Sequence, residues 1–366
     1  MTFDWRGWRT RCGAMTAPMT ERGRAWVIIA LVLTVLTVAA AVLAPIPFVA
    51  RSPGPLFDIL GTVDDKPVLV IDGAESYPTT GVLDMTTVAE SGGSAGPINV
   101  GTALVGLFSS DTSVLPDEDA DEPDSRQAQE AIFDASQSQA LGAAAGYLDR
   151  PVTSQVVVVQ VLPDSAADGV LEAGDVIMAV DGVPIRGREE LVTKVRASPP
   201  GTTFRFRIKR AGEVQTVSVT SRPDPDDPES ALVGIVPENR YRSDFTATVN
   251  LDGIGGPSAG LMLAVGMVDK LTPGDLLLGR RVAGTGTVDG DGVVGAIGGI
   301  DKKMLAAQEA GAELFIAPRD NCTEVLASQP EGLEVAAVAD LDQTMTVLQD
   351  WRDNKPVRGC PGTGDE

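Results

Sequence analysis

The longest apolar run in the chain lies near its amino terminus, where residues 25–49 carry no charged side chain. A helix that crosses a membrane needs about 20 such residues, and Ala25–Ala44 supplies them before two prolines interrupt the run. Arginines precede the run and aspartates follow it. The positive-inside bias then places residues 1–24 in the cytoplasm and everything after the run outside it. We therefore expect a transmembrane anchor at residues 25–49.

A cleavable signal peptide is the alternative interpretation of the same run. The small residues between Ala39 and Ala44 would suit a cleavage site. The run is longer, however, than the roughly 7–15 apolar residues of a signal core, and Pro45 would follow the most natural cleavage point. An uncleaved, single-pass anchor in the cell membrane, with the rest of the chain extracytoplasmic, is the interpretation that we adopt.

Downstream of the anchor, apolar residues recur with strand and helix periods in three blocks. The expected elements are strands 68–72 and 81–88 with helix 126–148; helix 188–197 with strands 203–210 and 213–220; and strand 313–317, helix 322–328, strand 333–338 and helix 341–351. The middle block predicts a β-rich module. The alternation in the last block is typical of α/β layering, in which helices pack on a sheet.

Composition and cysteine usage exclude several classes of function. The formal net charge is −22, whereas nucleic-acid binding needs a basic surface for contacts with phosphates. The pattern GxxxxGK[ST] does not occur, so no ATP-binding P-loop is expected, and Gly290–Gly295 matches GxGxxG only within a predicted hairpin. Cys12 falls on the predicted cytoplasmic side, while Cys322 and Cys360 fall outside. These two cysteines could form a disulfide, and the sequence does not decide whether they do. Without a CxxC or Cys/His cluster, we expect no metal and no cofactor.

A serine and a lysine are the candidates for catalysis in a chain that contains no histidine. Ser258 lies in the segment GGPSAG at the start of an apolar helical pattern, a position beside unpaired backbone N–H groups. Its hydroxyl needs a base to take the proton. Lys303 of GGIDKK falls on the inward side of a second amphipathic helix, where burial would populate its neutral amine. Lys302 is expected to face solvent, and Thr285 is placed to hydrogen-bond the amine.

The pairing of GGPSAG with IGGIDKK, and the AGTGT between them, resembles the proteolytic domain of Lon-type serine proteases. The resemblance runs from about Phe245 to Ile316 and continues more weakly to about Trp351. It implies a Ser-Lys dyad in which the serine of the first motif is the nucleophile and the second lysine of the other motif is the base. The threonine of AGTGT is implied as a support for that lysine.

This chain departs from the ATP-dependent members of that family close to the serine. Those members carry an aspartate three residues before it, where this chain has Gly255, and Asp252 is the candidate substitute. Members of the family commonly form hexameric rings, so the resemblance also implies a homo-oligomer.

The middle block is similar to a bacterial PDZ domain, most clearly from Asp164 to Ile185. Such domains bind extended peptide ends by adding a strand to a sheet edge. Their carboxylate-binding loop usually precedes the first strand, where Gly146-Tyr147-Leu148 is a loose match, and the peptide-binding residues are left unassigned. A rigid spacer that binds no peptide is the alternative.

The expected fold is α/β (α+β): a Lon-type proteolytic domain with an inserted PDZ-like β-rich domain, preceded by one transmembrane helix. The expected segments are a cytoplasmic tail (1–24), the anchor (25–49), the first part of the protease domain (56–148), the PDZ domain (150–223), the second part of the protease domain with the dyad (230–352) and a tail (353–366). The expected function is ATP-independent, membrane-anchored serine endopeptidase activity on unfolded or specific extracytoplasmic polypeptides, with PDZ-assisted binding. A non-catalytic membrane PDZ scaffold that binds polypeptide partners is the alternative.

Overall fold

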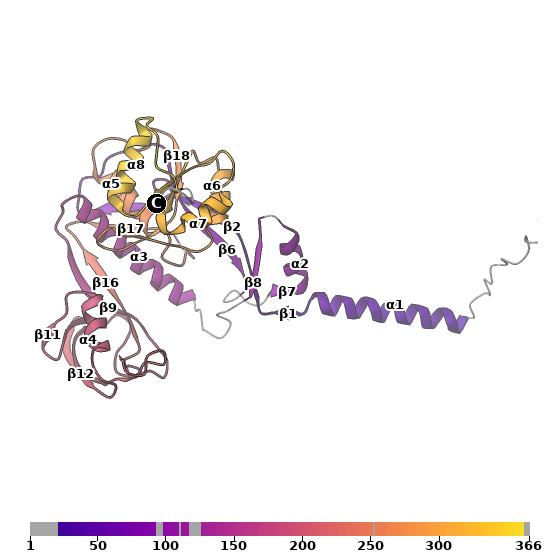
Figure 1. Cartoon of the computed structure of the whole chain (residues 1–366), viewed down its shortest axis with the longest axis horizontal. Coiled ribbons are helices and arrows are strands. Elements are labelled where there is room, and N and C mark those ends of the chain that lie inside the picture. Colours follow the sequence, from indigo (N-terminus) through magenta and orange to yellow (C-terminus); the bar gives the residue numbers. More distant parts are fainter. Residues whose placement is uncertain (1–20, 93–97, 110, 117–125, 252, 362–366) are drawn as a thin grey trace, which may run out of the picture.

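The computed structural model describes residues 21–92, 98–109, 111–116, 126–251 and 253–361, without the side chains of residues 21–25 and 126–128. Figure 1 shows a single extended helix at one end, an α/β body that contains the carboxyl-terminal part of the chain, and a β-rich unit beside that body. Most of the expected cytoplasmic tail, including Cys12, lies outside the described residues.

A mixed sheet of six strands forms the centre of the α/β body. Its order is β22 (Glu334–Val338), β21 (Leu314–Pro318), β18 (Arg281–Gly284), β6 (Val82–Ser91), β2 (Phe48–Asp58) and β8 (Ser113–Pro116). The strands from β22 to β6 are parallel, whereas β2 runs antiparallel to both β6 and β8. Two distant stretches of the chain, 48–116 and 281–338, therefore complete one sheet.

Helices cover both faces of this sheet. They are α3 (Arg126–Tyr147), α5 (Gly260–Leu271) and α8 (Leu341–Arg352) on one face, and α6 (Ile300–Glu309) and α7 (Cys322–Ser328) on the other. Val282 of β18 packs in the first core and the next residue, Ala283, in the second, because successive side chains of a strand point to opposite faces. The expected α/β layering is confirmed.

The helix α5 is the most deeply buried helix of the body. Every residue in it except Lys270 is buried. A Cβ atom at Gly266 would lie 2.8 Å from Ile59 Cγ2, so only glycine allows this close approach to the segment after β2. The residue that begins α5 is thereby fixed in position at the centre of the body.

A second sheet, with its own hydrophobic core, forms the β-rich unit. Its order is β13 (Glu213–Thr220), β12 (Thr203–Arg210), β10 (Val176–Val180), β9 (Thr153–Val161) and β16 (Ile235–Arg242), with β11 (Val183–Pro184) paired to β10 and α4 (Arg188–Arg196) packed on the core. Alternate residues of β12 are buried, as a half-buried strand requires. The sequence pattern placed β16 in the second half of the protease domain, but this strand pairs with β9 along its whole length.

Apart from α1 and α2, the remaining described elements are short antiparallel pairs and one 3₁₀ turn. They are β1 (Pro45–Ile46) with β7 (Ile98–Asn99), β3 (Thr62–Val63) with β4 (Lys66–Pro67), β5 (Leu69–Asp72) with β17 (Thr246–Val249), β14 (Arg222–Pro223) with β15 (Ala231–Leu232), β19 (Thr287–Val288) with β20 (Val294–Gly295), and η2 (Arg319–Asn321). The pair β19–β20 encloses Gly290–Gly292, so the GxGxxG match is a hairpin turn, as expected.

The amino-terminal apolar run forms the helix α1 (Glu21–Val42). This helix ends before Pro45 and Pro47, which lack the N–H donor that a continuing helix would use. The last part of the expected anchor is therefore strand, in β1 and the start of β2, rather than helix. Within the described residues, no helix combines the length and the apolarity that crossing a membrane requires. A further helix, α2 (Val100–Phe108), was not predicted from the sequence.

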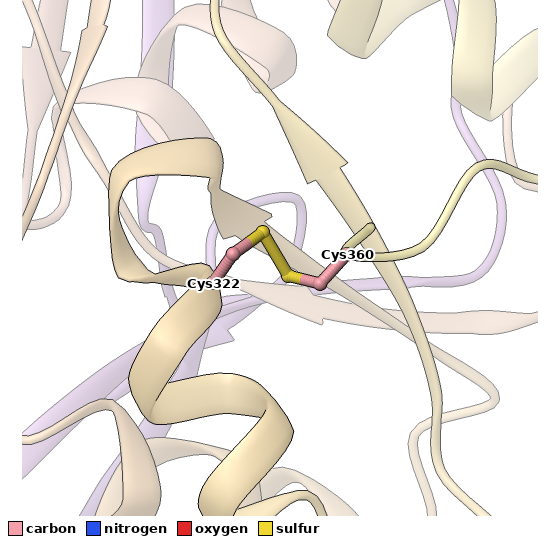
Figure 2. Close-up of a disulfide and its surroundings, with 2 residues drawn as sticks. All are labelled: Cys322 and Cys360. Carbon is pink, nitrogen blue, oxygen red and sulfur yellow. A yellow bond between two sulfur atoms is a disulfide. The ribbon is translucent and has the colours of Figure 1, made fainter. Parts of the chain in front are cut away.

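Cys322 and Cys360 form a disulfide, the pairing that the sequence left open (Figure 2). Cys322 is the first residue of α7, and Cys360 lies in the tail that follows α8. The N–H of Ala337 in β22 also donates a hydrogen bond to the Arg358 carbonyl of this tail at 3.0 Å. The disulfide therefore ties the tail to α7, and the hydrogen bond holds it against β22, the edge strand of the main sheet.

A carboxylate in α5 is buried with one oxygen unpaired. Asp269 is 3% exposed, and its Oδ1 accepts a hydrogen bond from the Leu276 N–H at 3.2 Å. Its Oδ2 has no hydrogen-bond partner among the described residues. Burial raises the pKa of this carboxyl to about 6. Because the folded pKa exceeds the unfolded value of about 3.9, the free energy of unfolding falls as the pH rises from about 4 to about 6.

We expect Asp269→Asn to remove this pH dependence and to stabilise the protein at pH 7 by about 1–2 kcal/mol. A shift of about two pKa units corresponds to roughly 3 kcal/mol, and part of that gain is lost because the new amide N–H groups would also lack partners. Urea unfolding followed by circular dichroism at pH 4 and pH 7 measures both effects. A variant that is less stable than wild type at pH 7 would contradict this explanation.

Candidate active site

Ser258 lies in the turn that leads into α5. Gly256 takes a positive φ of 81°, a conformation that favours glycine, and its N–H donates to the Gln129 carbonyl of α3 at 3.4 Å. The Ser136 hydroxyl of α3 donates to the Pro257 carbonyl at 3.0 Å. The helix α3 therefore holds the turn just before the serine, whose side chain stays half-buried.

Two backbone N–H groups at this turn are free to bind a negative charge. Those of Ser258 and Ala259 have no hydrogen-bond acceptor among the residues that the structure describes. Ala259 is the N-cap of α5, so both groups lie at the helix end that carries unpaired donors and the positive end of the dipole. Such an arrangement can stabilise an oxyanion that develops beside the serine hydroxyl.

The amine of Lys303 is buried in the first turns of α6. Lys303 is 3% exposed, and its Nζ donates a hydrogen bond to Thr285 Oγ1 at 3.0 Å. Burial lowers the pKa of this amine to about 8, and no carboxylate opposes that effect. Near pH 7 about one amine in ten is therefore neutral and able to accept a proton.

Thr285 connects the lysine to the serine. It is fully buried directly after β18, and its Oγ1 donates a hydrogen bond to the Ser258 carbonyl at 3.1 Å. Because the threonine proton is used in that bond, Oγ1 acts as the acceptor for the Lys303 N–H. The N–H of Gly286 donates to the same Ser258 carbonyl at 2.9 Å. The structure thus brings together the three residues that the sequence singled out.

Ser258 and Lys303 line the same cavity, which has a volume of about 530 Å³. The strands β2 and β6 contribute Arg51, Phe57, Met85, Thr86, Val88 and Glu90 to its wall. No motif marks these residues, and sequence reasoning missed them. In the described structure no hydrogen bond joins Ser258 Oγ to Lys303 Nζ. Catalytic hydrogen bonds often tighten only when a substrate is bound.

The prediction that Lys302 faces solvent is wrong. Its side chain is 9% exposed, and its Nζ forms an ion pair with Asp301 Oδ2 at 3.2 Å. Hydrogen bonds from Ser109 and from a backbone N–H, together with the Lys302 charge, hold the pKa of Asp111 below its usual range. The helical period of α6 cannot reveal that the rest of the fold buries this side chain.

Gly255, the position of the aspartate in the ATP-dependent family members, packs closely on α3. A Cβ atom at this position would lie 2.7 Å from Gln129 Cβ of α3, so a larger side chain would force α3 and the turn apart. Asp252, the candidate substitute, lies outside the described residues.

The structure also corrects the expected peptide-binding loop of the PDZ unit. Gly146 and Tyr147 belong to α3, and Leu148 follows its last residue, so these residues form no loop beside β9. The strand β16 lies beside β9 instead and is one of the two edge strands of the sheet, β13 being the other. The hydroxyl of Ser138 in α3 accepts a hydrogen bond from the Tyr241 N–H at 2.7 Å, which covers the carboxyl-terminal part of that edge.

We expect Thr285→Val to destabilise the protein by about 1–3 kcal/mol, because the Lys303 amine would lose its buried hydrogen-bond acceptor. Thr285→Ser keeps the hydroxyl and should lose much less stability. Urea unfolding of the two variants at pH 7 makes the comparison. If both variants lost the same amount of stability, the threonine would act through its methyl group and not through its hydroxyl.

Comparisons with known proteins agree with both parts of the structure. Residues 252–349 match the family described as the Lon protease C-terminal proteolytic domain, and residues 140–220 match the PDZ domain family. The chain is 33% identical to Lon protease 2 of Bacillus subtilis (strain 168) over 122 residues, which cover 32% of this chain and 21% of that relative. It is 29% identical to Lon protease 1 of the same organism over 184 residues, covering 48% of this chain and 23% of that relative.

Among solved structures, the PDZ domain of an SdrC-like protein from Listeria monocytogenes has 24% sequence identity and a TM-score of 0.21. The match covers 22% of this chain and 85% of that one. The chain spans about a fifth of the length of the Lon proteases named above. It contains a Lon-like serine peptidase domain that carries Ser258, Thr285 and Lys303, together with a PDZ domain.

Proposed function

We propose that the protein is an ATP-independent, membrane-anchored serine endopeptidase that uses Ser258 and Lys303 as a catalytic dyad. The observation that carries the proposal is the buried Lys303 amine, whose pKa of about 8 allows it to act as a base. It lines the same cavity as Ser258. Because the sequence contains no P-loop, the substrates are unfolded or flexible polypeptide segments that need no ATP-driven unfolding.

Acylation begins when neutral Lys303 Nζ accepts the proton of Ser258 Oγ as this oxygen attacks the substrate carbonyl carbon. The backbone N–H groups of Ser258 and Ala259 stabilise the oxyanion of the tetrahedral intermediate. The Lys303 ammonium then gives its proton to the leaving amine as the C–N bond breaks. Thr285 keeps one amine N–H engaged throughout, which leaves the lone pair available for the serine proton.

Deacylation repeats these steps with water. Lys303 Nζ accepts a proton from the water molecule as its oxygen attacks the acyl carbon of the ester on Ser258. The second tetrahedral intermediate collapses, and the lysine returns the proton to Ser258 Oγ. The product acid leaves, and the dyad returns to its starting protonation state.

Two features support an extracytoplasmic site of action at a membrane. The large apolar side chains of α1 are exposed, Trp26 by 71%, so this helix offers an apolar surface to lipid. The Cys322–Cys360 disulfide suits an oxidising compartment. In this arrangement residues 1–24 are cytoplasmic, and the PDZ and peptidase units act outside the cell membrane.

We place peptide binding by the PDZ unit at the part of the β16 edge that α3 leaves open, near Ile235. An extended peptide can add there as a further strand. Arg188 of α4 lies beside this strand, with its N–H donating to Asn239 Oδ1 at 2.9 Å and its guanidinium bonded to Glu238 at 3.0 Å. A polypeptide held at this edge would be presented to the peptidase domain of the same chain.

The proposal is tested by incubating the detergent-solubilised full chain with casein, an unfolded substrate, in the absence of ATP. We expect fragments on a gel with wild type and none with Ser258→Ala. Lys303→Arg should be inactive as well, because a guanidinium stays protonated and cannot accept the serine proton.

Lys302→Ala is the matched control for the lysine substitution. Both lysines are buried in α6, but Lys302 pairs with Asp301 rather than with Thr285, so Lys302→Ala should retain activity. Activity in Lys303→Arg would overturn the dyad. A wild-type protein that binds casein but does not cleave it would favour the alternative of a non-catalytic PDZ scaffold.

A further inference from the structure

The helix α2 packs on the protein with its small residues and exposes its large apolar residues. Its buried residues are the small Ala103 and Gly106, whereas its large apolar side chains point outward, with Val105 72% and Phe108 91% exposed. A Cβ atom at Gly106 would lie 2.7 Å from Val114 Cγ2 of β8, so the small residues are needed for close packing on the protein. A helix in contact with water would normally place its large apolar side chains against the protein.

Short contacts fix α2 at the carboxyl end of α1. The N–H of Val100 donates to the Ala44 carbonyl at 3.2 Å, and β1 pairs with β7 directly before α2 begins. A Cβ atom at Gly101 would lie 2.8 Å from Val42 Cγ1, which brings the first turn of α2 against the last turn of α1. The exposed apolar surface of α2 is therefore continuous with that of α1.

The composition and the position of α2 both favour lipid as the partner. No charged residue occurs from Ile98 to Ser109. Figure 1 shows α2 beside the end of α1, while the PDZ unit and the helices of the peptidase domain lie farther along the molecule. An uncharged helix with its large side chains outward, placed where an anchor helix ends, suits the boundary between headgroups and acyl chains.

We propose that α2 is a second membrane contact, which inserts Leu104, Val105, Leu107 and Phe108 into the outer surface of the bilayer beside α1. The proposal rests on the membrane anchoring proposed above. Asp111 and the polar segment after α2 then mark the return of the chain to water.

This contact would bring the peptidase cavity close to the bilayer. α2 packs on β8, and Ser113 of β8 pairs with Arg51 of β2, which lines the cavity. The end of the cavity that contains Arg51 is thus one strand away from the lipid-contacting helix. Polypeptide segments that emerge from the membrane are the substrates that this placement would favour.

Spin labels on the full chain test the contact. In a Cys12→Ser background, single cysteines replace Phe108, Val105, Trp26 or Leu326, and each is labelled with a nitroxide after reconstitution in vesicles of phosphatidylcholine and phosphatidylglycerol. Oxygen concentrates in the bilayer and a nickel chelate stays in water, so the ratio of their relaxation effects reports lipid exposure. Leu326 in α7 is the matched control, because it is an exposed leucine in a helix that packs on α6 and β21, whereas α2 packs on α1, β2, β7 and β8.

We expect the oxygen-to-nickel ratio at Phe108, Val105 and Trp26 to exceed that at Leu326 several-fold. A high ratio at Trp26 with low ratios at both α2 positions would overturn the α2 contact and leave the anchor intact. Low ratios at Trp26 and α2 alike would overturn the anchor and the α2 contact together. Protection of Phe108 and Val105 from both reagents would show that another protein surface covers α2, which also overturns the proposal.

Discussion

The hydrogen bond between the Lys303 amine and the Thr285 hydroxyl is the contact on which the candidate site depends. A lysine amine inside a protein is costly when charged, and here burial lowers its pKa to about 8. An ion pair with a carboxylate would raise the pKa again and remove the base. A neutral hydroxyl orients the amine without that effect, and it also bonds the carbonyl of Ser258. One side chain therefore positions both members of the proposed dyad.

The two folded units are joined more closely than an insertion at a surface loop requires. Tyr241 of β16 stays paired with β9 in the PDZ sheet and packs its ring against Gly142 of α3 and Gly290 of the β19–β20 hairpin, where any larger residue would collide with it. The hairpin starts two residues after Thr285, and α3 holds the turn before Ser258. The strand that ends the PDZ sheet thus contacts both elements that support the site.

Local sequence patterns predicted the residues of the site and most elements of the body. Ser258, Thr285 and Lys303 lie in short glycine-rich motifs, and the helices and strands after residue 313 have clear periods, so each could be recognised without knowledge of the tertiary structure. Long-range pairing could not be predicted in the same way. It adds β16 to the PDZ sheet and forms the cavity wall from β2 and β6. The period of α6 also does not show that Lys302 is buried. The helix α2 was not predicted, because the pattern expected of a helix in water places large apolar side chains against the protein. In α2 these side chains are exposed instead.

The pH dependence of peptide hydrolysis tests the central claim most directly. If neutral Lys303 is the base, kcat/KM for a short peptide should rise with pH and level off above an apparent pKa near 8, since the neutral amine becomes the main form there. A short substrate without ionisable groups in this range ensures that the enzyme alone titrates. A rate that is constant between pH 6 and pH 9, or that falls as the pH rises, would contradict a lysine base.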